Sequence, residues 1–168
     1  MIILIATCAF ALFYVACTLL SYAKVKWQDR FLMMVLCIFT ILIGIRKGWP
    51  DQNVYAIAFK EAPLPWEIDW SGEFYGYVEH GYLLLASIVK LVYNNTTFYF
   101  LVMGGLSMFL LYKGLKKYCA IPLLGLCDYV GRFMLNRDFQ QMRSSLAILL
   151  MVWGIVLIRK KKMWQYLL

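Results

Sequence analysis

Metal-binding and redox motifs are missing from this sequence. Histidine occurs once in 168 residues, and the cysteines form no C-x-x-C pair. All five cysteines, at positions 8, 17, 37, 119 and 127, lie in apolar segments. We therefore expect small buried hydrophobic residues rather than disulfide or zinc partners. The sequence predicts no metal site and no cofactor.

Acidic residues are also scarce, with nine against 17 lysines and arginines, which gives a net charge of +8. A nucleic-acid-binding protein would spread its basic residues along one face with aromatic residues between them. Here they form short clusters between apolar blocks, around residues 24–30, 113–117 and 159–162. Such clusters are typical of the cytoplasmic loops of membrane proteins, so we expect no nucleic acid partner.

Apolar residues are abundant, at 63% of the chain with a mean hydropathy of +0.69. A soluble domain is nearer to half apolar. The apolar residues come in long blocks that lack the alternation of barrel strands. In hydrocarbon the backbone must satisfy its own hydrogen bonds, so the spans should be helices. The predicted fold class is all-α, a polytopic integral membrane helical bundle, with residues 1–168 as a single membrane domain.

The apolar blocks predict about five spans, at residues 2–23, 31–45, 96–112, 118–135 and 144–158. No basic residue precedes the first block, as a cleaved signal peptide would require, so we expect a retained span with the N-terminus outside. Segment 81–93 is short and is expected at the membrane surface, because both later basic clusters then fall inside. Residues 163–168 look like the start of a sixth span, so we expect the N-terminal part of a longer protein.

A long polar stretch follows the second predicted span. Residues 46–80 contain six of the nine acids and only three basic residues, a net charge of −3. Their prolines and glycines argue against one long helix. We predict an extracytoplasmic loop over residues 46–95 that includes the interfacial helix. Its many aromatic residues would either anchor the loop at the interface or form a stacking surface for sugar rings.

Two further polar features lie near the last predicted spans. Residues 136–143, with the sequence NRDFQQMR, are expected to form a tight turn on the same side as the acidic loop. Asp128 and Arg132 lie four residues apart within a span and hence on one helical face. They would form either a structural ion pair or a functional charged pair, because charge inside a membrane is costly.

Several short motifs follow one another in a distinctive order. Arg46 closes the second predicted span, Asp51 and Tyr55 lie just beyond it, and the segments EHGYLLL and NRDFQQMRSSLA come later. Together they resemble the EpsG family, the Wzy-like polymerases of bacterial O-antigen, capsule and exopolysaccharide. His80 replaces a usual proline, Tyr55 displaces the aromatic partner of Asp51, and Met142 stands where isoleucine is common. The matching positions, over roughly residues 40–150, are Arg46, Asp51, Tyr55, Glu79, Gly81, Tyr82, Asn136, Gln141, Arg143, Leu146 and Ala147.

The resemblance implies a glycosyltransferase of GT-C-like architecture in the bacterial inner membrane. Its partners would be membrane lipid and a polyprenyl-diphosphate-linked oligosaccharide, and it leaves room for a chain-length regulator protein. The leaving diphosphate needs cations, and arginine suits it through fixed donors and a permanent charge. The predicted diphosphate-binding residues are Arg46, Arg137, Gln141 and Arg143, although membrane snorkelling would also explain Arg46.

The attacking sugar hydroxyl needs a general base. The candidates on the outside loop are Asp51, Glu79 and His80. Asp51 fits best by the resemblance and by its closeness to Arg46, whereas a lone histidine is more often structural.

A transporter or flippase of lipid-linked saccharides is the alternative function. Asp128 and Arg132 would then line a path through the membrane, but the sequence shows no inverted repeat. Polar groups gathered at one membrane face would favour a transferase, and polar groups at the midplane would favour a transporter. A small structural subunit is a third alternative, for which the long acidic and aromatic loop has no obvious use.

Overall fold

The computed structural model describes residues 2–70 and 80–159, and these residues contain helices but no strand. This confirms the all-α part of the predicted fold class. In chain order the elements are α1 (Ile2–Ser21), α2 (Val25–Ile45), α3 (Gln52–Glu61), α4 (His80–Val92), α5 (Thr96–Tyr118), α6 (Pro122–Tyr129), the π-helix η1 (Val130–Asp138) and α7 (Met142–Arg159).

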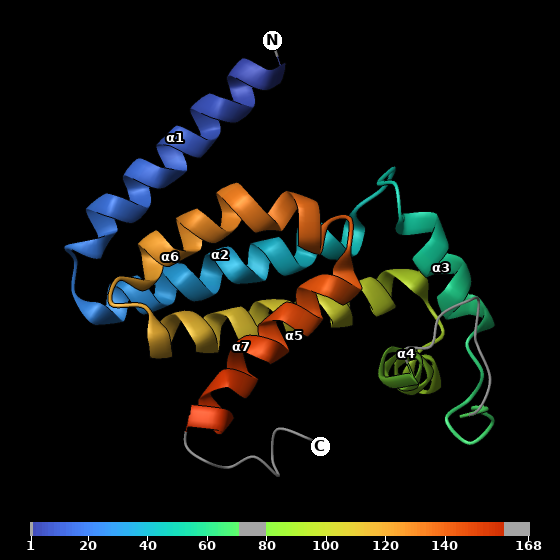
Figure 1. Ribbon diagram of the computed structural model, residues 1–168. Helices are drawn as coiled ribbons and strands as arrows, with labels where there is room; N and C mark the ends of the chain where they lie inside the picture. The colour runs from blue at the N-terminus through green and yellow to red at the C-terminus, as the bar shows by residue number, and fades with distance from the viewer. Residues whose placement is uncertain (1, 71–79, 160–168) are drawn as a thin grey trace.

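Helices α2 and α5 pack side by side at the centre of the molecule (Figure 1). They run in opposite directions, because Asp29 near the start of α2 bonds Lys116 near the end of α5. Close packing near the other end depends on Gly44. A Cβ atom there would lie 2.3 Å from Cδ2 of Leu101, so any larger residue would force α2 and α5 apart.

Within residues 2–70 and 80–159, two helices, α2 and α5, are long and apolar enough to cross a membrane. The other apolar helical segments in the described part of the chain are shorter, at Thr7–Ser21, His80–Val92 and Met142–Gly154. The predicted count of five spans therefore stays a prediction. Both long helices extend beyond the predicted spans, α2 from Val25 and α5 to Tyr118, because charged side chains at helix ends can reach polar surroundings.

The segment predicted as a single span, residues 118–135, is instead divided between the end of α5, α6 and η1. Pro122 lies in the first turn of α6, where its missing N–H costs nothing. The helix then widens, and the N–H of Phe139 donates to the carbonyl of Met134, five residues earlier, at 3.2 Å. The helix continues to Asp138, so the turn predicted at residues 136–143 shrinks to residues 139–141.

Helix α1 packs mainly on α6 and leans away from the other helices in Figure 1. Cys17 of α1 and Cys127 of α6 are buried there, as predicted, and all five cysteines are free. The prediction of burial was wrong for Cys8 and Cys37, which are exposed. Exposed apolar side chains are common on α1, α2 and α7, as expected for surfaces that face lipid.

Helices α3 and α4 lie beside the end of the molecule where α2 ends and α5 begins (Figure 1). The Nζ of Lys90 in α4 donates to the carbonyls of Lys60 and Ala62 at 2.7 and 2.6 Å, which ties α4 to the end of α3. In Figure 1, α4 is seen end-on while α2 and α5 run across the view. Because α4 crosses the direction of α2 and α5, it is suited to lie along a membrane surface. The location of α4 at the interface stays a prediction.

The two ends of the α2–α5 pair differ in composition. At one end Lys116 bonds Asp29 at 2.7 Å, and Lys117 lies 4.9 Å from the ring centre of Trp153 in α7. We call this the basic end, defined by Lys26, Arg30, Lys113, Lys116 and Lys117. The opposite end is the arginine–tyrosine end, defined by Arg46, Tyr55, Tyr82, Tyr99, Asp138 and Arg143.

Candidate functional site

Arg46 lies at the centre of the arginine–tyrosine end, directly after α2. It is 5% exposed, and its guanidinium carbon is 4.6 Å from the ring centre of Phe100. One terminal nitrogen donates to the backbone carbonyl of Asp138, and the other is 3.6 Å from the sulfur of Met142. Burial lowers the pKa of Arg46, but an arginine keeps its charge in a protein. A buried cation therefore joins the end of α2 to the junction of η1 and α7.

Asp138, the last residue of η1, is the main acid of this cluster and is 2% exposed. One carboxylate oxygen accepts a hydrogen bond from the hydroxyl of Tyr129 at 2.7 Å, and the other accepts from the hydroxyl of Ser145. Burial raises the pKa of Asp138, while the two hydroxyl donors and Arg46 oppose that rise. The result is a polar network inside the bundle.

Arg143, in the first turn of α7, lies among the tyrosines of the same end. Its guanidinium carbon is 5.6 Å from the ring centre of Tyr55 in α3 and 5.5 Å from that of Tyr82 in α4. The hydroxyl of Tyr99 in α5 donates to that of Tyr82. Side chains of α3 and α4 thus surround one arginine of α7, and α5 supports them through Tyr99. Cation–π contact holds the planar guanidinium in a limited set of orientations.

The three candidate bases have different surroundings. Asp51 is half-buried directly before α3, and the side chain of the next residue, Gln52, donates to the carbonyl of Arg46 at 2.8 Å. His80 begins α4, and its ring stacks on Trp70 with the ring centres 5.8 Å apart. Glu79 lies outside the described residues. The contact through Gln52 links the start of α3 to the end of α2, which supports the predicted closeness of Asp51 and Arg46.

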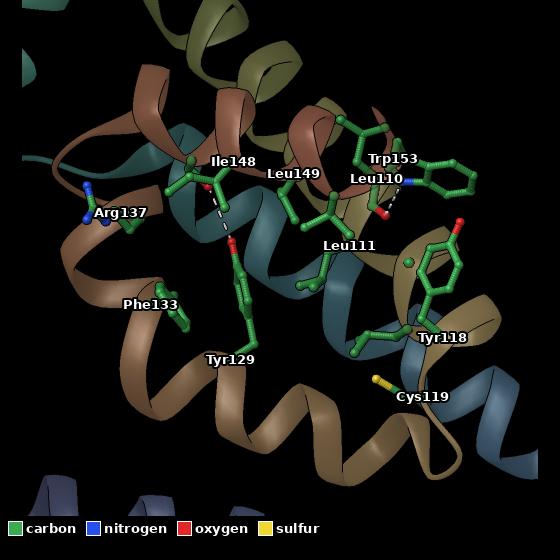
Figure 2. A pocket seen from close by; sticks show the side chains of 14 residues that line it. Leu110, Leu111, Tyr118, Cys119, Tyr129, Phe133, Arg137, Ile148, Leu149 and Trp153 are labelled. Atoms are coloured by element: carbon green, nitrogen blue, oxygen red, sulfur yellow. Dashed lines mark hydrogen bonds between the residues drawn. The ribbon is translucent and has the colours of Figure 1, made fainter. Parts of the chain in front are cut away.

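Arg137 and Gln141, predicted to bind the diphosphate with Arg46 and Arg143, pair with each other. Nη1 of Arg137 donates to Oε1 of Gln141 at 2.7 Å. Arg137 also lines an apolar cavity of about 290 Å³ between α5, η1 and α7. Figure 2 shows Tyr129 and Phe133 on the η1 side of this cavity and Arg137 at its edge. These two residues form a separate polar pair beside the arginine–tyrosine cluster.

Asp128 and Arg132 form the predicted ion pair, with Nε of Arg132 2.7 Å from Oδ1 of Asp128. Their side chains are 62% and 74% exposed. With Phe10 and Tyr14 of α1 they line a groove on the surface of the bundle. The pair therefore lies on the outside of the described bundle, and this does not favour a charged path through its interior.

Sequence reasoning missed Asp138, Tyr129 and Ser145, because their partnership depends on the π-helical turn. The polar signal was present in the segment NRDFQQMR, but the sequence did not distinguish the buried acid from its exposed neighbours. Tyr82 and Tyr55 were found through the resemblance, and the structure adds that both rings face Arg143.

The model of one protein family, EpsG, matches residues 29–168, which include every residue of the arginine–tyrosine end. The chain belongs to the EpsG family. No curated protein and no solved structure matches it. The EpsG family is associated with Wzy-like polymerases. At the family level this EpsG protein is a membrane protein of polysaccharide biosynthesis with a polymerase-like, glycosyltransferase-like role.

Proposed function

We propose that this EpsG protein polymerises lipid-linked oligosaccharide repeat units for a bacterial O-antigen, capsule or exopolysaccharide. The substrate is a saccharide on a polyprenyl diphosphate in the inner membrane. A hydroxyl of the incoming unit attacks the anomeric carbon of the growing chain. The bond from that carbon to the diphosphate oxygen breaks, and polyprenyl diphosphate leaves with the electron pair.

The observation that carries this proposal is the position of two arginines at one end of the bundle. Arg46 is buried behind the cluster, and Arg143 is only partly buried. Their charges favour the negative charge that develops on the leaving diphosphate. Arg137 and Gln141, on the adjacent surface, would bind more distant oxygens of the same lipid diphosphate.

The general base takes the proton of the attacking hydroxyl. Asp51, Glu79 and His80 are the candidates, and Asp51 is preferred because α3 begins beside Arg46. Trp66 and Trp70 in the same loop are exposed and would provide apolar faces for sugar rings. A chain-length regulator protein would act on the same outer side.

The membrane arrangement is part of this proposal. We propose five spans, the N-terminus and the arginine–tyrosine end outside, the basic end in the cytoplasm, and α4 at the outer interface. The positive-inside rule supports this orientation, because Lys24, Lys26, Lys113, Lys116 and Lys117 gather at the basic end, whereas Lys47, Lys60 and Lys90 near the other end are outnumbered. Buried charges at the other end, rather than at mid-bundle, favour a transferase over a flippase of lipid-linked saccharides.

The proposal is tested in a strain whose own polymerase is deleted, with the natural full-length protein supplied on a plasmid. The wild type should restore long polysaccharide chains. Arg143→Ala and Arg143→Lys should reduce polymerisation by about ten- to a hundred-fold, because lysine lacks the planar two-point contact. Lys117→Ala is the matched control, since Lys117 also lies over aromatic rings but at the basic end.

Equal protein levels of all variants are confirmed by immunoblot. Failure of the wild type to restore any chain longer than one repeat unit would reject the polymerase itself. Equal chain-length patterns in Arg143→Ala and Lys117→Ala would reject the assignment of the site.

A further inference from the structure

The proposed reaction gives no role to Asp138, although this acid is almost fully buried. A buried carboxylate is costly unless its oxygens are satisfied, and both oxygens of Asp138 accept hydrogen bonds. A buried network whose groups are all satisfied rigidifies the elements that it joins. The elements that it joins indicate which geometry is fixed.

Each contact of Asp138 reaches a different helix. Tyr129 ends α6, and Ser145 belongs to the first turns of α7. The backbone carbonyl of Asp138 accepts from Arg46, at the end of α2. The hydroxyls of Tyr129 and Ser145 also lie 3.3 Å apart, which closes the network. One residue thus holds the ends of three helices together.

The start of α7 is held from two directions. Ser145 is bound to Asp138, and Met142 is in contact with the guanidinium of Arg46. Arg143 lies between these two anchored positions in the chain. The two anchors thus flank the point of α7 from which the Arg143 side chain reaches Tyr55 and Tyr82.

We propose that Asp138 is a positioning residue: through Ser145 and Arg46 it fixes the first turn of α7 and thereby aims Arg143 at the substrate. This inference rests on the proposed diphosphate contact of Arg143. Asp138 itself does not meet the substrate, because it is 2% exposed. A displacement of about 1 Å in such a contact can reduce a rate by roughly a hundred-fold, so a buried network remote from the reacting atoms can matter for activity.

The test combines hydrogen exchange with a double-mutant cycle in the purified full-length protein. Asp138→Asn keeps the size of the side chain but replaces one acceptor oxygen by a donor. Backbone amides of residues 145–147, the first that α7 protects, should then exchange about ten-fold faster or more, because the anchor at Ser145 is released. Asp128→Asn, at an exposed acid of the neighbouring α6, is the control and should leave these amides unchanged.

The cycle asks whether Asp138 acts through Arg143. Initial rates are measured with a synthetic polyprenyl-diphosphate-linked repeat unit. Asp138→Asn should lower the rate by about ten-fold in the wild-type background and by less than about two-fold in the Arg143→Lys background. Ser145→Ala removes only one hydroxyl and should show the same pattern with smaller changes, so a folding failure of Asp138→Asn does not prevent the test.

Unchanged exchange at residues 145–147 in both variants would overturn the proposal. Equal rate losses in the wild-type and Arg143→Lys backgrounds would also overturn it, since Asp138 would then act independently of Arg143. If the wild-type protein forms no polymer, the proposed function fails, while the exchange measurement still decides whether Asp138 holds α7.

Discussion

The basic end and the arginine–tyrosine end carry their cations in opposite ways. At the basic end the side chains of Lys116 and Asp29 are 44% and 30% exposed, and water screens their attraction. At the other end Arg46 and Asp138 are 5% and 2% exposed. An exposed cation costs little free energy, so its presence says little about function. A buried cation is costly unless hydrogen bonds and ring contacts compensate for the lost water, so buried cations identify a region where the charge serves a function.

The kinds of cation differ as well. Lys117 lies over Tyr118 and Trp153 at the basic end, whereas Arg143 lies over Tyr55 and Tyr82 at the other. Both contacts are cation–π contacts. Lysine offers a mobile point charge, while arginine offers a planar fork of donors that matches phosphate oxygens. The lysines of the basic end therefore fit the positive-inside pattern, whereas the arginines of the other end are suited to bind an anion.

Helix packing gives the largest expected contrast between the ends. Gly44→Ala places a methyl group 2.3 Å from Leu101 and should destabilise the protein by about 3 kcal/mol. Gly114→Ala, near the basic end, meets no atom within 4 Å and should stabilise it by up to about 1 kcal/mol. Thermal unfolding in detergent measures both. Equal shifts would show that α2 and α5 are not in close contact near Gly44.

Two tyrosines provide a smaller contrast. Tyr129→Phe removes a donor from buried Asp138 and should cost about 1.5 kcal/mol. Tyr112→Phe removes a 3.3 Å bond to Asp29 and should cost less than about 0.5 kcal/mol. Unfolding midpoints in denaturant at constant detergent concentration give the two values. A larger loss of stability for Tyr112→Phe than for Tyr129→Phe would show that the basic end, rather than the arginine–tyrosine end, has the stronger hydrogen bonds.

The smallest expected effect is a pH dependence from Asp138. Its pKa is raised in the folded protein by burial, so folding favours the protonated acid. The free energy of unfolding should therefore fall as pH rises from the ordinary aspartate pKa through the folded value. Asp138→Asn should remove this component, and thermal unfolding across that pH range would measure it. An Asp138→Asn variant with an unchanged pH profile would show that Asp138 makes no such contribution, and a component that rises with pH would contradict the direction of the shift.

Much of the helical arrangement follows from the sequence, because long apolar blocks and clustered lysines constrain a membrane chain strongly. The blocks located α1, α2, α4, α5 and α7, and the motifs brought Arg46 and Arg143 to the same end. The contacts between buried polar side chains did not follow from the sequence. The buried position of Asp138 depends on η1, and a π-helical turn has no clear sequence pattern.

The grouping of Arg137 and Gln141 with Arg143 shows the same limit. Adjacent polar residues in a predicted turn were expected to act together. Because η1 continues to Asp138 and α7 starts at Met142, Arg137 lies on η1, Gln141 in the short turn and Arg143 on α7. Arg137 then bonds Gln141, whereas Arg143 reaches the tyrosines of α3 and α4.

The opposite location of the two ends across a membrane is tested most directly by cysteine labelling in intact cells. Asn53→Cys in α3 and Lys113→Cys in α5 both replace exposed residues, in a background whose native cysteines are replaced by alanine. A membrane-impermeant thiol reagent should label position 53 from outside and position 113 only after the cells are opened. Labelling of both positions from outside, or of position 113 alone, would contradict the placement of the arginine–tyrosine end at the outer surface.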